Sequence, residues 1–180
     1  MTFFQRNILL SHSKLQSPDH PVSMRKPIVG IVMGSESDRE VMSESVRVIE
    51  ELGIAYELMV SSAHRNPSRT RRYARNAQKR GIKVIIAGAG AAAHLAGAIA
   101  SETALPVIGV PLGSSPLKGL DSLLSTAQMP AGVPVATMAI GKAGARNAGL
   151  MAAEILAISN SNILRRIKSF RRRWRQKSSK

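Results

Sequence analysis

The chain has 180 residues, of which 44% are hydrophobic, and it carries a formal net charge of +15. This fits one globular domain with a substantial core, and no stretch approaches the roughly 20 apolar residues of a membrane span, so we expect a soluble protein without a membrane partner. Cysteine is absent, which excludes disulfides, thiolate nucleophiles and cysteine zinc sites and suits a reducing, cytoplasmic location.

Residues 1–26 precede the first strand-like run. They hold four Lys or Arg and one acid, and their apolar piece, residues 8–10, is too short for a convincing secretory signal. Two interpretations fit: a weak targeting peptide and a flexible N-terminal extension. We favour the extension, and Met24 provides an alternative start just before the first strand.

From Pro27 onward, continuous apolar runs alternate with segments whose apolar residues recur every three or four positions. Strands that are apolar throughout are typical of a parallel sheet covered on both faces. The rhythm therefore predicts a three-layer α/β/α sandwich, in which ligands bind beyond the carboxyl ends of the strands. The predicted strands lie within residues 28–33, 54–60, 84–87, 107–110 and 133–140.

The first loop that this rule selects follows residues 28–33. Gly34 permits a close backbone approach, Ser35 offers a hydroxyl, and Ser37 with Glu40 has the spacing of a capping box, which predicts a helix start that favours an anion. Asp38 can accept hydrogen bonds from ribose hydroxyls. The competing interpretation is that Ser37 and Asp38 only cap the helix, which leaves Ser35 unexplained.

The second loop holds Ser62, His64 and Arg65, directly after residues 54–60. A histidine moves protons near neutral pH, and an arginine beside it holds an anion. A lone histidine is more often structural than catalytic, but the position of this one at a strand's carboxyl end favours acid/base chemistry on a phosphorylated substrate. The four histidines show no metal-ligand spacing, and we predict no metal site.

A helix is expected to begin near Pro67 and to run to Gly81. Its arginines suit a solvated or subunit-facing surface, and we assign them no catalytic role. They are Arg69, Arg71, Arg72 and Arg75.

The third loop, residues 88–97, contains Gly-x-Gly-x-x-Ala and superficially matches a dinucleotide-binding fingerprint. Two features argue against this fingerprint. The match follows the third strand-like run instead of the first, and no Asp or Glu lies about 20 residues farther on to hold a ribose. A nucleotide-binding oxidoreductase is therefore weakly supported. The small residues suit a tight pocket lined by backbone amides, and His94 fits two roles equally, in that pocket or in capping the next helix.

Together, the three loops resemble the PurE family, which includes N5-carboxyaminoimidazole ribonucleotide mutase and the catalytic subunit of phosphoribosylaminoimidazole carboxylase. The resemblance covers about residues 27–158 and implies a flavodoxin-like catalytic domain that assembles as a homo-octamer. It is carried by the segments VGIVMGSESD, VSSAHRNP, VIIAGAGAAAHLAG and GVPLGSSPLKGLDSLLSTAQMPAGVPVATMAIGKAGARNAGLMAAEIL.

The resemblance implies a step of purine (IMP) biosynthesis. A carboxylate moves from N5 to ring carbon C4 of a phosphoribosyl aminoimidazole, without ATP, metal or organic cofactor. The loop patterns look like the bacterial-type mutase, and the alternative is an aminoimidazole ribonucleotide carboxylase that uses CO2 directly.

Residue roles follow from the same resemblance. His64 matches the catalytic acid and base. Ser35, Asp38 and Arg65 match positions that bind substrate. The pocket wall is matched by Ser62, Ala89, Gly90 and Leu95, and further pocket candidates are Gly34, Ser37 and His94.

Three positions depart from the family pattern: Asn66 stands for a usual threonine, Ala91 for a glycine and Ala96 for a proline. None is the proposed proton donor. Loss of the proline restores backbone freedom to the loop expected to close on CO2, so the departures bear on efficiency more than on the type of reaction.

Residues 159–180 form the last predicted unit, with nine Lys or Arg and no acid after residue 160. An apolar stripe at helical spacing predicts a basic C-terminal helix that packs on a neighbouring subunit. A nucleic-acid-binding module is the less favoured alternative, because charge runs are more often solvated helix faces. The stripe comprises Ile163, Ile167, Phe170 and Trp174.

Overall fold

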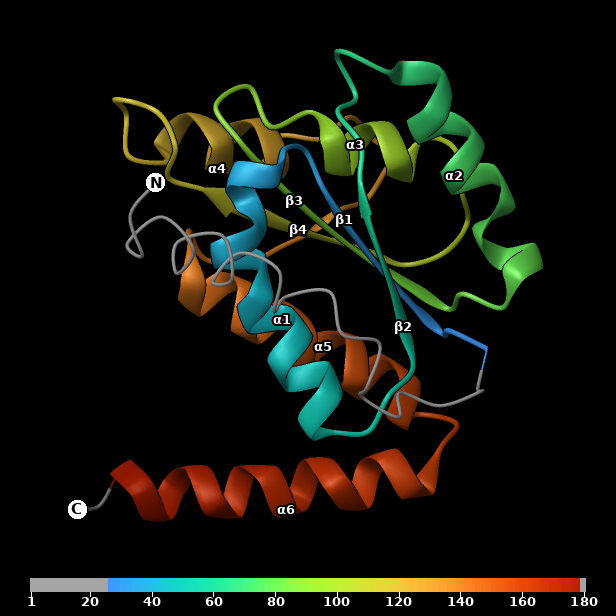
Figure 1. Cartoon of the computed structure of the whole chain (residues 1–180), viewed down its shortest axis with the longest axis vertical. Helices are drawn as coiled ribbons and strands as arrows, with labels where there is room; N and C mark the ends of the chain where they lie inside the picture. Colours follow the sequence, from blue (N-terminus) through green and yellow to red (C-terminus); the bar gives the residue numbers. More distant parts are fainter. Residues whose placement is uncertain (1–25, 179–180) are drawn as a thin grey trace, which may run out of the picture.

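The computed structural model describes residues 26–178, and its centre is a five-stranded, all-parallel sheet (Figure 1). The strand order is β2-β1-β3-β4-β5, the flavodoxin-like order. The predicted α/β sandwich with a parallel sheet is confirmed. The strands are β1 (Val29–Met33), β2 (Tyr56–Val60), β3 (Val84–Gly90), β4 (Val107–Leu112) and β5 (Ala136–Thr137).

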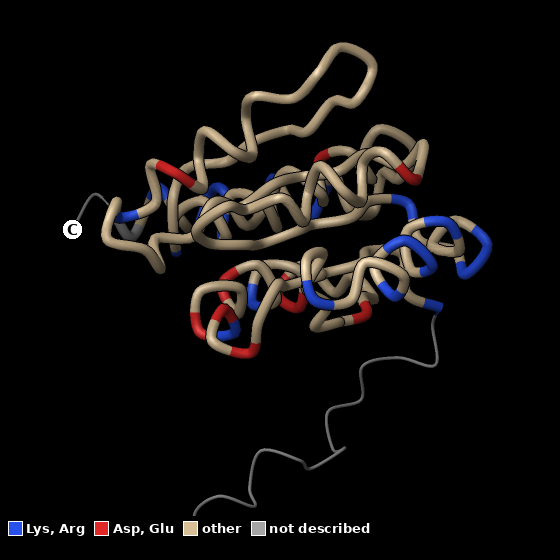
Figure 2. The backbone as a smooth tube through the Cα atoms, turned by 90° about the horizontal axis from the view of Figure 1, so that it is seen from above, with Lys and Arg blue, Asp and Glu red and all other residues tan. Residues whose placement is uncertain are grey.

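Helices cover both faces of the sheet (Figure 1). α1 and α5 pack on one face, and α2, α3 and α4 pack on the other. Seen from above, Lys and Arg gather at the end of the molecule where α2 lies (Figure 2). The helices are α1 (Arg39–Glu51), α2 (Pro67–Arg80), α3 (Leu95–Ala100), α4 (Leu120–Ala127), α5 (Lys142–Ala157) and α6 (Ser161–Ser178), and a short 3-10 turn, η1 (Glu36–Asp38), precedes α1.

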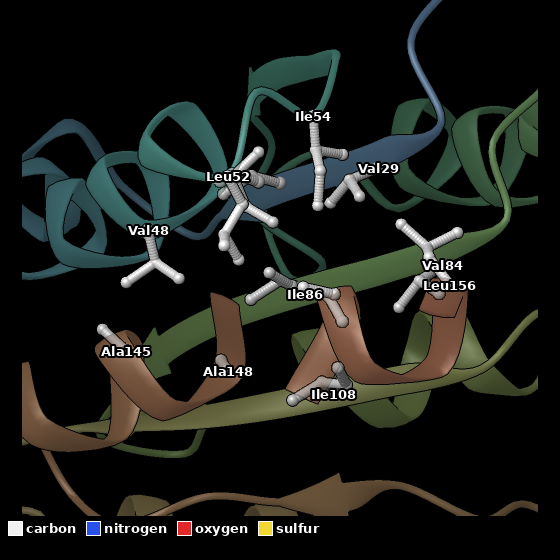
Figure 3. Close-up of a cluster of buried hydrophobic side chains, with 14 of the residues drawn as sticks. Val29, Val48, Leu52, Ile54, Val84, Ile86, Ile108, Ala145, Ala148 and Leu156 are labelled. Atoms are coloured by element: carbon white, nitrogen blue, oxygen red, sulfur yellow. The ribbon is translucent and has the colours of Figure 1, made fainter. Parts of the chain in front are cut away.

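The central strands are buried on both faces, which explains their unbroken apolar runs. In β1, Ile31 faces the core under α1 and α5, whereas Val32 faces the core under α2 and α3. Figure 3 shows the first of these cores, where Ile86 and Ile108 of the sheet lie close to Ala148 of α5. Small alanines on α5 let this helix approach the sheet closely.

Two predicted strands differ in length from the observed ones. The third continues through Gly88 and Gly90, which we expected in a loop; Gly88 lies so close to Met42 that a Cβ would be 2.2 Å from its sulfur. The fifth was expected over residues 133–140 but comprises two residues at the sheet edge. Pro134, just before it, has no amide hydrogen for a strand ladder.

The predicted C-terminal helix is observed as α6, beside α5 (Figure 1). Ile163, Ile167 and Phe170 are buried in the core of their own chain, whereas Trp174 is 47% exposed. Packing of α6 on a neighbouring subunit stays a prediction. The predicted extension over residues 1–26 and the alternative start at Met24 lie outside the described residues, apart from residue 26. Within residues 26–178, no helix is long and apolar enough to cross a membrane.

Candidate active site

A cavity of about 310 Å³ opens at the carboxyl ends of β1, β2 and β3. All eleven residues that the sequence nominated line this cavity, and their chemical roles stay predictions. The cavity is lined by Gly34, Ser35, Ser37, Asp38, Ser62, Ala63, His64, Arg65, Ala89, Gly90, Ala91, Ala92, Ala93, His94, Leu95 and Ser114.

The sheet order explains why these residues meet. β1 has β2 on one side and β3 on the other, so the connections after β1 and after β3 lead away from the first strand in opposite directions. A crevice forms at such a reversal, and parallel α/β sheets place ligands there. Three loops separated by about 30 residues each in sequence therefore face one space.

The first loop forms a capping box that begins two residues earlier than expected. The hydroxyl of Ser35 accepts from the Ser37 amide at 3.4 Å, and the Asp38 carboxylate accepts from the Ser35 amide at 3.0 Å. The predicted pairing of Ser37 with Glu40 is wrong, because Ser37 already lies inside the 3-10 turn. Glu40 instead forms an ion pair with Lys142 at 2.6 Å.

Asp38 is only 7% exposed, although it lines the cavity. Burial raises the pKa of Asp38, and the backbone N–H groups of Ser35 and Gly34 offset part of this rise. A buried carboxylate with few donors gains from each further hydrogen bond. Asp38 therefore caps η1 and also fits as an acceptor for ligand hydroxyls.

His64 and His94 meet across the cavity. Nε2 of His64 lies 2.6 Å from Nδ1 of His94, and the rings are edge-on at 77°. One nitrogen must donate and the other accept, so the pair holds a proton between two rings that are 30 residues apart in sequence. His94 makes no side-chain cap to α3, so of its two predicted roles the structure provides the contact in the pocket.

The Arg65 backbone is fixed by Ser62, whose hydroxyl accepts from the Arg65 amide at 3.2 Å. Asn66, which stands for a usual threonine, is the N-cap of α2 and accepts from the Arg69 amide at 3.1 Å. Asparagine and threonine both cap helices well. This substitution therefore keeps the helix start that follows His64.

The loop after β3 turns tightly against the cavity. Ala91 and Ala93 have positive φ values of 50° and 24°, a region that alanine enters at a cost of about 1 kcal/mol or more. Ala91 stands where the family pattern has glycine, so this chain keeps the turn despite a side chain that opposes it. The strain lies next to His94.

Ser114, which was not among the predicted site residues, follows β4 and lies over Gly90. A Cβ added at Gly90 would be 1.8 Å from the Ser114 hydroxyl oxygen, so the absence of a side chain at Gly90 makes room for that serine. The signal was present: Ser114 follows the fourth apolar run, and the rule about carboxyl strand ends applies to it as well. Among residues 26–178, no three His, Cys, Asp or Glu side chains cluster as metal ligands do.

Comparison with known proteins shows the family of this chain. Residues 28–177 match the family described as AIR carboxylase. The N5-carboxyaminoimidazole ribonucleotide mutase of Thermotoga maritima is 56% identical over 83% of this chain and 86% of its own. The mutase of Bacillus subtilis is 55% identical over 84% of this chain and 93% of its own.

The solved structure of Treponema denticola PurE is also similar. Its TM-score is 0.76, its sequence is 27% identical, and the match covers 84% of this chain and 93% of that one. Fold, loop motifs and relatives therefore agree with the resemblance found in the sequence. The chain belongs to the AIR carboxylase family.

Proposed function

We propose that this protein is an N5-carboxyaminoimidazole ribonucleotide mutase, an isomerase of purine biosynthesis. The observation that carries the proposal is the identity of more than half of the aligned residues with relatives of that name, over most of both chains. The candidate cavity adds a histidine pair, a buried carboxylate and an arginine in one space. These are the groups that proton transfer on a phosphorylated ribonucleotide needs.

In this proposal, His64 handles the proton. The bond between N5 and the carboxylate carbon breaks, CO2 is released within the site, and His64 gives a proton to N5. Ring carbon C4 then forms a bond to CO2, and His64 takes up the proton that C4 loses. His64 ends in its starting state, and His94, 2.6 Å away, provides an acceptor when His64 carries both protons.

The remaining cavity residues hold the substrate. Arg65 and Ser35 bind the phosphate, which suits a guanidinium and a hydroxyl, and Asp38 accepts from the ribose hydroxyls. Gly90 and the alanines after it carry little or no side chain, so in this proposal the ring lies close to the backbone and displaces the water of the cavity. Retention of CO2 depends on this, because an escaped molecule would leave only aminoimidazole ribonucleotide.

We further propose that the protein acts in the cytoplasm as a homo-oligomer, with the octamer as the expected state. Support for assembly comes from large apolar side chains that stay exposed around the start of α4. Leu117, Leu120 and Leu124 are 62%, 54% and 50% exposed, and Ile140, which lies near Gly119, is 36% exposed. Such patches mark interaction surfaces. Sedimentation of the purified chain as a monomer at micromolar concentration would contradict the octamer.

The decisive experiment compares two substrates without ATP. One arm supplies N5-carboxyaminoimidazole ribonucleotide, and the other supplies aminoimidazole ribonucleotide with low bicarbonate. We expect rapid formation of 4-carboxy-5-aminoimidazole ribonucleotide in the first arm only. Efficient turnover in the second arm would assign the protein to the carboxylases that use CO2 directly, and turnover in neither arm would contradict both functions.

A further inference from the structure

The surface of α2 is strongly cationic and is not used by the candidate active site. The helix carries six Lys or Arg and no acid over 14 residues. Like charges three and four positions apart repel one another on a helix, so this arrangement costs stability. Lys and Arg gather at the end of the molecule where α2 lies (Figure 2). The six cations of α2 are Arg69, Arg71, Arg72, Arg75, Lys79 and Arg80.

Neighbouring acids neutralise this charge only in part. Glu102 binds both Arg71 and Arg75, at 2.9 and 2.6 Å, so one carboxylate serves two guanidinium groups. Within residues 26–178, neither Arg72 nor Lys79 has an acid within 4.0 Å. Four cations against one carboxylate leave a net charge of +3 on this face.

These side chains line a groove of about 400 Å³, which shares no residue with the active-site cavity. Its lining contains no apolar and no aromatic side chain. Protein interfaces are built around an apolar core, and base recognition by stacking needs aromatic rings. Arginine, lysine, serine and asparagine are the residues that contact phosphate and sugar. The groove consists of Ser68, Arg71, Arg72, Arg75, Asn76 and Lys79.

We propose that this groove binds the sugar-phosphate backbone of double-stranded nucleic acid without reading its sequence, since a duplex presents its phosphates with the bases already stacked inside. The binding site is α2, not the basic C-terminal helix that the sequence suggested for such a role. Of the cations on α6, Arg171 and Arg173 form ion pairs with Glu154 and Glu51 of their own chain. Those two are therefore less available to a ligand than Arg72 and Lys79.

The test measures the anisotropy of a fluorescent duplex of about 20 base pairs, titrated with the full chain between about 50 and 200 mM salt. For duplexes, log affinity falls by about 0.9 per phosphate contact for each decade of salt, so a net charge of +3 predicts a slope of about −3. A·T and G·C duplexes should bind within about threefold of each other, because phosphate contacts carry no sequence information.

Two matched double variants locate the site. Arg72→Glu with Lys79→Glu should weaken binding at least tenfold and bring the slope close to zero. Arg165→Glu with Lys168→Glu, which reverses two exposed charges on α6, should leave both values within about twofold. Unchanged mutase turnover in both variants checks the fold, since neither pair lines the cavity.

Three results would overturn the proposal. The first is no binding by the wild-type chain at 50 mM salt. The second is loss of binding in the α6 variant but not in the α2 variant. The third is equal affinity for poly-glutamate of matched charge, which would show a general response to anions rather than recognition of a phosphate backbone.

Discussion

Replacement of Asp38 by asparagine should make the protein more stable and less active. Asp38 is 7% exposed, and burial raises its pKa in the folded chain. A carboxyl group of this kind contributes stability below its unfolded pKa and loses that contribution as the pH rises through the folded pKa. At neutral pH, the ionised Asp38 is therefore a cost to folding, which the amide removes.

The magnitude follows from the contacts. Asparagine keeps an oxygen that can accept from the Ser35 amide at 3.0 Å, so the cap survives while the buried charge is lost. Removal of this buried charge is expected to raise the free energy of unfolding by about 1 kcal/mol. For a chain of this size, that corresponds to a rise of about 2–4 °C in Tm. Loss of one charged hydrogen bond to ribose costs about 1.5–3 kcal/mol, so kcat/KM should fall at least about tenfold.

The assay is thermal unfolding of Asp38→Asn and wild type from about pH 4 to pH 8, with steady-state kinetics at neutral pH. The stability gain should be largest at neutral pH and should shrink as the pH falls and the wild-type carboxyl takes up its proton. Asp121→Asn is the matched control. Asp121 lies in the first turn of α4, where a negative charge stabilises the helix, and it accepts from the Ser115 hydroxyl at 2.9 Å. The free energy of unfolding of this variant should therefore fall by about 0.3–1 kcal/mol. A destabilised Asp38→Asn, or a gain independent of pH, would refute the reasoning.

Three further substitutions test other contacts. His64→Asn should fold normally, bind substrate and lose at least about 100-fold in turnover, whereas full turnover would exclude its proton role. Gly90→Ala places a Cβ 1.8 Å from the Ser114 hydroxyl oxygen, so the free energy of unfolding, measured by calorimetry, should fall by about 1–3 kcal/mol. Steady-state kinetics should show a reduced kcat/KM. Unchanged activity would show that Ser114 has no part in the site. Arg166→Ala removes hydrogen bonds of 2.8 and 3.1 Å to the carbonyls of Leu52 and Gly53, directly after α1. The free energy of unfolding should fall by about 1–2 kcal/mol, seen as a lower Tm, with turnover unchanged.

Much of the fold could be predicted from local pattern. The runs that became β1 and β4 are apolar because those strands lie within a covered parallel sheet, and Pro67 and Gly81 marked the two ends of α2. Strand lengths were harder to predict. Glycines at the end of β3 suggested a loop, but they are strand residues that leave room for Met42 and Ser114.

The helix start after β1 shows a second limit. Two capping boxes fit the sequence, one from Ser35 to Asp38 and one from Ser37 to Glu40, and the spacing rule is identical for both. Backbone conformation decides between them: Ser35 is extended, with φ −149° and ψ 158°, as an N-cap must be. No local pattern contained that information.

The sequence by itself determined the family, the parallel α/β class and the loops that supply the candidate site. It could do so because periodicity and loop motifs are local properties of the chain. The tertiary structure alone decided which side chains touch: His64 meets His94, Ser114 joins the cavity, and Glu102 reaches Arg71 and Arg75. These contacts depend on the order of the strands and on the register of the helices against them. The loop that holds Ser62, His64 and Arg65 thus indicated a chemistry, and the folded sheet provided its partners.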